Sequence, residues 1–233
     1  MRGSSPAAPG RPADTAPKPA RLAYFTIALA ALGLITTANR LGARGLEAAA
    51  PGLLWLVALC IPSLLVCLLI YLGARPSHPF ALPRPGTPWG RLLRVGGTWL
   101  VLWVAGSAVA ALVAGHWIRY TSGRFALLCF VIVGPLQEEL LYRGVLFELA
   151  ERGWPRGRWW GSVVASTIPF ALQHFQFYGY RLTGAALLQV AFTLPMGVAL
   201  GRMRQASGSV WPGWIVHVLT NLTGAFGTGP SGS

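Results

Sequence analysis

Long apolar stretches separated by short polar connections dominate this chain. A helix needs about 20 mostly apolar residues to cross the hydrocarbon core of a bilayer. Seven stretches approach that length: residues 22–38, 52–73, 95–115, 125–149, 159–175, 184–201 and 210–227. Within the sixth, Gly197 and Gly201 have the small-x-x-x-small spacing that lets another helix of the same chain approach closely. The pattern predicts an all-α protein, a polytopic bundle of about seven transmembrane helices.

The segments outside these stretches differ in composition. Residues 1–20 are rich in Pro, Ala and Gly and are predicted to be a disordered basic tail. Residues 21–124 hold the N-terminal spans and a proline-rich connection, residues 74–94, that is expected to lie along the membrane interface. Residues 125–227 are predicted to form a transmembrane core of four helices, and residues 228–233 a flexible C-terminal tail.

Composition agrees with a location in a membrane. Of the 233 residues, 54% are hydrophobic and only 11% are charged, whereas about a quarter of an ordinary soluble domain is charged. The net charge of +13 would suit nucleic acid, but the basic residues lie mainly in the tail and the connections, where they act as topology signals. We therefore expect a lipid bilayer as partner and no nucleic acid. The alternation of basic residues along successive connections predicts a cytoplasmic N-terminus, and the preference for Arg over Lys is typical of a GC-rich bacterium, which indicates the bacterial cytoplasmic (inner) membrane.

Two adjacent glutamates stand inside one of the apolar stretches. Glu138 and Glu139 are two of only six acidic residues in the chain. Carboxylates are costly at membrane depth, so their presence there predicts a functional site. Arg143 follows Glu139 by four residues in the favourable acid-first order, which predicts an ion pair between the two. Glu138 is then left to take a proton from water and return it to a leaving amine.

Three further polar residues fall within apolar stretches. His217 and Asn221 are four residues apart and share one helix face. A helical hairpin that turns near residues 155–157 places His174 at the depth of Glu138, and the arginines of the flanking turns predict a cavity open toward the cytoplasm. Imidazole and amide groups beside Glu138 could orient a water molecule and stabilise an oxyanion. Together these groups suit hydrolysis of an amide bond in an intramembrane cavity.

Other interpretations of these residues lead to different classes of protein. A structural ion pair accounts for Glu139 and Arg143 but not for Glu138 or His174. Glutamate and histidine are also zinc ligands, which keeps a zinc-dependent membrane protease open, although H-E-x-x-H is absent. A non-catalytic binding or immunity protein could use the same cluster to sequester a peptide partner. A proton-coupled transporter would usually contain inverted repeats, and none is apparent.

Three short motifs follow one another on successive predicted helices. They are E-E-x-x-x-R (Glu138, Glu139, Arg143), F-x-x-x-H (Phe170, His174) and H-x-x-x-N (His217, Asn221). Together they resemble the CAAX protease and bacteriocin-processing family of intramembrane glutamic endopeptidases, which includes the type 2 CAAX prenyl proteases. The resemblance covers roughly residues 125–223.

The resemblance implies a proteolytic mechanism without a metal or another cofactor. Glu138 would activate water with help from His174, while His217 and Asn221 would form the oxyanion hole. The supporting residues would be Glu139, Arg143 and Phe170. The implied partner is a peptide or membrane-protein substrate. Its identity does not follow, because eukaryotic family members cleave prenylated tails whereas bacterial ones are tied to peptide processing, immunity or membrane regulation. The oligomeric state does not follow either.

Overall fold

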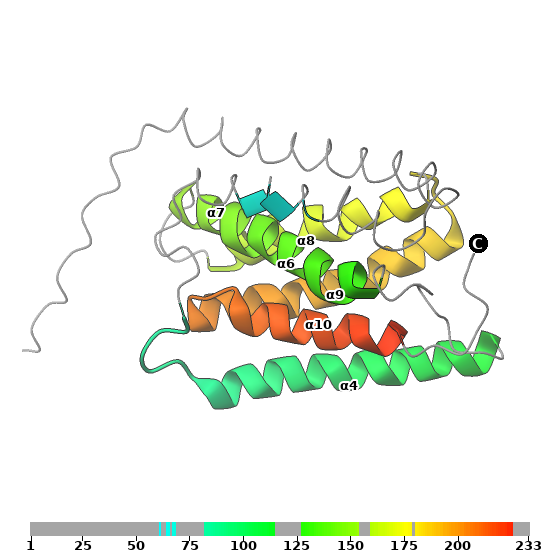
Figure 1. Cartoon of the computed structure of the whole chain (residues 1–233), viewed down its shortest axis with the longest axis horizontal. Coiled ribbons are helices and arrows are strands. Elements are labelled where there is room, and N and C mark those ends of the chain that lie inside the picture. The colour runs from blue at the N-terminus through cyan, green and yellow to red at the C-terminus, as the bar shows by residue number, and fades with distance from the viewer. Residues whose placement is uncertain are drawn as a thin grey trace, which may run out of the picture.

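The described part of the chain is entirely helical. The computed structural model describes residues 82–114, 127–153, 159–178 and 180–225, together with residues 61, 64, 65, 67 and 68. Every regular element in these residues is a helix of the α, 3-10 or π type. The predicted all-α class is therefore confirmed for this part of the chain, which is drawn in Figure 1.

Two of the helices are long and apolar enough to cross a membrane. They are α4 (Trp89–Ala114) and α9 (Gly184–Ser207). Helix α8 (Trp159–Gln173), which continues into the 3-10 turn η4 (His174–Tyr178), and helix α10 (Trp211–Ala225) are shorter. A helix of 15 residues extends about 22 Å, less than the roughly 30 Å of a bilayer core. The first two predicted spans lie largely outside the described residues, so the total of seven stays a prediction.

The stretch that carries the two glutamates is one continuous helical segment of mixed type. It contains the π-helical turn η2 (Cys129–Val133), α6 (Gly134–Glu138), the π-helical segment η3 (Glu139–Leu146) and α7 (Phe147–Gly153). Pro135 has no N–H to donate to the carbonyl four residues earlier, which is a physical reason for irregular pairing in η2. The sequence predicted a regular helix here. π-Helical turns inside helices are frequent at functional sites.

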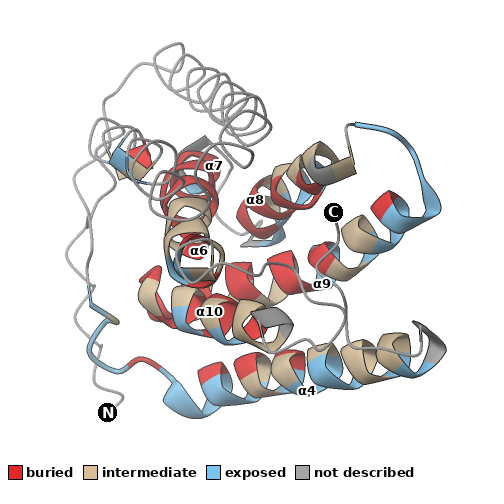
Figure 2. Cartoon of the chain, turned by 45° about the vertical axis from the view of Figure 1, so that its right-hand side comes forward, coloured by how far each residue is buried: buried red, intermediate tan, exposed pale blue. Residues whose placement is uncertain are grey.

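The helices form layers that enclose one apolar core. In Figures 1 and 2, α9 and α10 lie between α4 on one side and α6, α7 and α8 on the other. Two indole groups of α4 hold α10: Trp99 Nε1 donates to Thr220 Oγ1 at 3.0 Å, and Trp103 Nε1 donates to Thr223 Oγ1 at 2.6 Å. The first of these hydrogen bonds is buried and the second is partly buried, and both tie specific positions of the two helices together.

Helix α9 packs against α8 through Gly197 and Gly201. A Cβ atom at Gly197 would lie 2.7 Å from Thr167 Cγ2, and one at Gly201 would lie 3.1 Å from Val163 Cγ1. Real Cβ atoms do not come that close without displacing a neighbour. The small-x-x-x-small pair thus serves contact between helices of one chain, as the sequence predicted.

The outer face of α4 is apolar and exposed. Its large exposed side chains include Leu93, Val101, Leu102, Val109 and Leu112, and the exposed side of α4 is visible along its length in Figure 2. An exposed apolar face that follows a whole helix is rare on a soluble monomer. Lipid around α4 accounts for it, because hydrocarbon side chains lose nothing by facing hydrocarbon.

The start of α4 differs from the prediction. The helix begins at Trp89, six residues before the predicted span and inside the connection that was expected to lie along the interface. The carbonyl of Pro88 accepts hydrogen bonds from the backbone N–H groups of Arg91 (2.9 Å) and Leu92 (3.1 Å), which starts the helix there. Arg91 and Arg94 therefore belong to the first turns of a long helix rather than to a loop.

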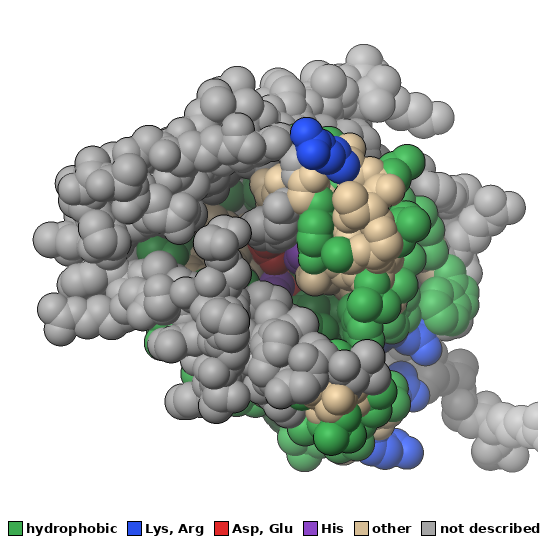
Figure 3. Space-filling model, turned by 90° about the vertical axis from the view of Figure 1, so that its right-hand side faces the viewer, with side chains coloured by type: hydrophobic (Ala, Val, Ile, Leu, Met, Phe, Trp, Pro, Cys, Tyr) green, Lys and Arg blue, Asp and Glu red, His purple; other side chains and the backbone are tan. Residues whose placement is uncertain are grey.

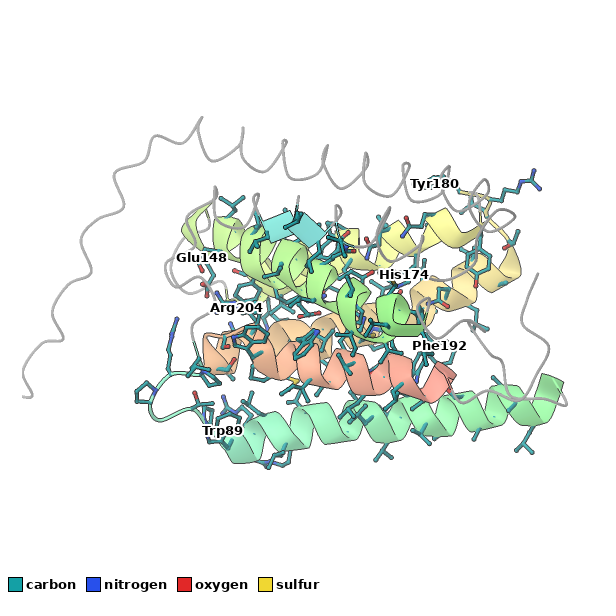
Figure 4. All side chains as sticks on the ribbon, viewed as in Figure 1. Trp89, Glu148, His174, Tyr180, Phe192 and Arg204 are labelled. Carbon is teal, nitrogen blue, oxygen red and sulfur yellow. The ribbon has the colours of Figure 1, made fainter. Side chains whose placement is uncertain are left out.

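Arg204 also lies in a different environment from the one expected, which was a connection between two spans. Helix α9 continues to Ser207, where Gly208 adopts a φ of 69° and donates its N–H to the carbonyl of Arg204. The buried guanidinium of Arg204 donates to the carbonyl of Arg143 (2.9 Å) and to Glu148 Oε2 (3.2 Å). Figure 4 shows Arg204 and Glu148 at the same end of the molecule. This arginine joins α9 to η3 and α7.

Replacement of Gly197 by Ala is expected to destabilise the fold. The added methyl group would collide with Thr167 Cγ2 and lie 3.2 Å from Phe170 Cδ1, and such overpacking typically costs about 1–3 kcal/mol. The melting temperature of the purified, detergent-solubilised protein should fall. Gly97→Ala is the matched control, because its Cβ meets nothing within 4 Å. Equal melting temperatures for the two variants would contradict the close helix contact.

Candidate active site

A fully buried ion pair lies at the centre of the site. Arg143 Nη1 donates to Glu139 Oε1 at 3.0 Å, and neither side chain is exposed. The guanidinium also donates from Nη2 to the carbonyl of Gly197 at 3.4 Å and lies 4.0 Å from the centre of the Phe170 ring. The opposite charge, the hydrogen bonds and the ring face together compensate for the loss of water around the buried guanidinium.

His217 lies between the two glutamates. Its Nδ1 is 3.2 Å from Glu139 Oε1, and its Nε2 is 3.4 Å from Glu138 Oε2. A neutral imidazole that donates from Nδ1 has a lone pair at Nε2, so a hydrogen bond to Glu138 requires one further proton on either group. The sequence placed His217 on the same helix face as Asn221 but did not predict contact with both carboxylates.

Glu138 is the accessible member of the acidic pair. Its side chain is 21% exposed, whereas that of Glu139 is 0% exposed. Glu138 is the last residue of α6 and Glu139 the first of η3, so the change of helix type falls between them. The two carboxylates thus occupy different environments: Glu139 is held by Arg143, and Glu138 is partly exposed beside His217.

His174 joins this cluster through Phe170. It is the first residue of η4, and its Nδ1 is 2.9 Å from the carbonyl of Phe170. Because a carbonyl only accepts, Nδ1 carries the hydrogen of this bond, and Nε2 of the neutral ring is left as an acceptor. The ring of Phe170 contacts His174 at 5.2 Å and His217 at 5.8 Å between centroids, edge to face in both cases.

Asn221 lies one turn beyond His217 on α10. Its Nδ2 donates to the carbonyl of Phe130 at 2.9 Å, and Trp214 Nε1 donates to the carbonyl of Ile132 at 3.3 Å. Both carbonyls belong to η2. An amide NH₂ has two N–H bonds, so Asn221 both anchors α10 to η2 and retains a second donor. The sequence contained the H-x-x-x-N spacing but no signal for this anchoring.

One glycine shapes the site without a functional group of its own. A Cβ atom at Gly213 would lie 3.0 Å from Glu139 Oε2, and among the described residues this oxygen is buried with no hydrogen-bond partner. Gly213 stands in the first turn of α10, and the positive end of a helix favours a carboxylate nearby. Nothing in the sequence distinguished this glycine from others at helix starts.

The polar cluster is visible from one end of the molecule. Figure 3 looks at the end where α8 finishes and α9 starts, and shows carboxylate and imidazole atoms at the bottom of a hollow. This is the end of Tyr180, opposite the end that carries Trp89, Arg204 and Glu148 in Figure 4. The sequence predicted an opening on the arginine-bearing side. Buried Arg204 and Glu148 occupy that side in the described structure.

No group of three or more His, Cys, Asp or Glu side chains is arranged to hold a metal ion within the described residues. The expectation of metal-free chemistry stays a prediction and needs a solution test.

Long apolar helices that surround buried carboxylate and imidazole groups are the arrangement of a membrane-embedded enzyme. A family model, described as Type II CAAX prenyl endopeptidase Rce1-like, matches residues 120–223. The match spans all three motifs, and it supports assignment of this segment to the CAAX protease family of membrane-embedded proteases. No curated protein and no solved structure gives a significant match to the chain.

Removal of Arg143 alone should be much more damaging than removal of the whole ion pair. Arg143→Met leaves Glu139 buried without its partner, which typically costs about 3–5 kcal/mol. The double variant Glu139→Gln/Arg143→Met leaves no uncompensated charge and should recover most of the lost stability. Thermal unfolding of the three purified proteins measures the difference. A double variant no more stable than Arg143→Met would show that the pair is not the main electrostatic constraint.

Gly213→Ala should reduce peptide cleavage because its methyl group would push Glu139 away from His217. A displacement of about 1 Å near a reacting centre can lower a rate by roughly 100-fold. Gly184→Ala is the matched control, since Gly184 also stands in the first turn of a helix but a Cβ atom added there would meet nothing within 4 Å. Cleavage rates of the two variants in membranes provide the comparison. Wild-type activity in Gly213→Ala would show that Gly213 is not needed for the position of Glu139 beside His217.

Proposed function

We propose that this protein is an intramembrane endopeptidase that hydrolyses a peptide bond in a membrane-associated protein or peptide, with water activated by Glu138. One observation carries the proposal. His217 contacts both glutamates, yet only Glu138 is partly exposed, while Glu139 is fully buried and paired with Arg143. The first carboxylate is accessible for chemistry, and the second holds the imidazole in place.

The proposed reaction moves one proton through Glu138. The carboxylate takes a proton from water as the water oxygen forms a bond with the carbonyl carbon of the peptide. The resulting tetrahedral intermediate collapses, the carbon–nitrogen bond breaks, and the leaving amine receives the proton from Glu138. The products are a new carboxyl terminus and a new amino terminus, so that all atoms of the water molecule are accounted for.

The neighbouring groups support the water and the oxyanion. With Nδ1–H directed to the carbonyl of Phe170, His174 can accept a hydrogen from the attacking water at Nε2. A protonated His217 donates from both nitrogens, to Glu139 through Nδ1 and to Glu138 or an adjacent oxyanion through Nε2. The second N–H of Asn221 is a further candidate oxyanion donor. None of these steps requires a metal ion or another cofactor.

The hollow in Figure 3 supports access of an extended peptide to the cluster from the end of the bundle. We infer a location in the bacterial cytoplasmic membrane with a cytoplasmic N-terminus, from the distribution of basic residues in the sequence.

Comparison of peptide termini tests the proposal. Membranes from cells that contain wild-type protein or Glu138→Gln, at matched abundance, should differ in a defined set of new termini. The amide cannot accept the proton, so these termini should fall at least about 100-fold. Glu151→Gln is the matched control, because Glu151 is an exposed carboxylate of α7 outside the cluster.

Two outcomes would change the assignment. Identical termini with folded Glu138→Gln protein would favour a binding or immunity protein that sequesters a peptide without hydrolysis. Loss of cleavage after treatment with a metal chelator, and its return on addition of zinc, would favour the zinc-dependent alternative.

A further inference from the structure

A second polar cavity lies away from the glutamates. It has a volume of about 690 Å³ and lies between the first turns of α4 and the last turns of α9. The described residues that line it are Arg91, Leu92, Arg94, Val95, Arg202, Gln205 and Ala206. Trp89, which marks the start of α4 in Figure 4, lies at this end of the molecule. The cavity is thus at the opposite end from the hollow that exposes the polar cluster in Figure 3.

The lining combines positive charge with an apolar wall. Three of its residues are arginines, and among the described residues that line it none is acidic. Arg91 and Arg94 are exposed, while Leu92 is 3% exposed and belongs to the hydrophobic core. The guanidinium of Arg202 lies 4.8 Å from the ring centre of Trp160, which limits its range of positions. An anionic group with an attached apolar part fits both halves of this lining.

The position of the cavity matches the headgroup level of a membrane. Helices α4 and α9 are the two described helices of membrane-spanning length, and the cavity lies where one begins and the other ends. Trp89 is exposed at the same level, as tryptophans of interfacial belts are. From there the exposed apolar side chains of α4, including Leu93 and Leu102, continue along the helix. Acyl chains could follow this face while a headgroup occupies the cavity.

A role in orienting the protein in the membrane does not by itself account for these three arginines. Basic residues that orient a membrane protein need only lie near the end of a span, whereas these three come from two helices and line one cavity. Its volume is in the range of small-molecule sites and exceeds what a single phosphate fills.

We propose that this cavity binds the phosphorylated headgroup of an anionic phospholipid. Arg91, Arg94 and Arg202 hold the phosphate oxygens, which accept hydrogen bonds from guanidinium groups, and Leu92 and Val95 contact the apolar part next to the headgroup. Basic pockets between transmembrane helices recognise anionic lipids in this way. The inference is independent of the reaction proposed for Glu138.

Thermal unfolding of the full-length protein in detergent micelles tests the site. Addition of dioleoyl phosphatidylglycerol should raise the melting temperature of the wild type by about 5 °C, since a ligand of the folded state stabilises it. Dioleoyl phosphatidylcholine and inorganic phosphate at the same concentration should not. The increase should disappear in Arg91→Gln/Arg94→Gln/Arg202→Gln. The double variant Arg91→Gln/Arg94→Gln, which keeps the contact of Arg202 with Trp160, should lose most of it.

Single substitutions provide a matched comparison. Arg94→Gln should reduce the effect of phosphatidylglycerol, whereas Arg181→Gln, which removes an exposed arginine between α8 and α9, should leave it unchanged. An undiminished increase in the folded double variant would overturn the proposal. An equal effect of phosphatidylcholine would replace it with non-specific lipid contact, and an equal effect of inorganic phosphate would replace it with a small-anion site.

Discussion

The buried pair of Glu139 and Arg143 is the constraint on which the rest of the site depends. Both side chains are fully buried, and two desolvated charges persist only when neighbouring groups compensate for lost water. Helix α9 contributes the carbonyl of Gly197, α8 contributes the ring of Phe170, and α10 contributes His217. Three helices must therefore reach their places before the pair is satisfied, and this requirement links correct packing to the presence of the site.

The irregular helix that carries the glutamates makes these contacts possible. π-Helical turns interrupt the regular backbone ladder, and side chains from other helices bind carbonyls within them. Asn221 and Trp214 donate to η2, and Arg204 donates to Arg143 in η3. The ends of the irregular segment are thus tied to α9 and α10 by specific hydrogen bonds. Interactions of this kind hold a backbone in place more selectively than apolar contact does.

Local spacing in the sequence was sufficient to predict some contacts between the site residues but not others. The pairing of Glu139 with Arg143 and the contact of Phe170 with His174 depend on residues four apart, which helical geometry brings together. Contact of His217 with both glutamates depends on the close approach of α10 to Glu139 at Gly213, which involves residues far apart in the chain. The burial of Arg204 was missed for a similar reason, since its partner Glu148 is distant in sequence. The motifs of residues four apart identified the components of the site, and tertiary packing determined their contacts.

The position of His217 between two carboxylates also gives a proton two adjacent sites in the cluster. Glu138, Glu139 and Arg143 together carry a net charge of −1 when both carboxylates are ionised, so one added proton makes the group neutral. A low-dielectric interior favours a cluster of side chains whose charges add to zero. The proton has two adjacent places, Nε2 of His217 and Oε2 of Glu138, which are 3.4 Å apart. His217 therefore places two groups that can hold a proton, one imidazole and one carboxylate, next to each other at the accessible edge of the cluster.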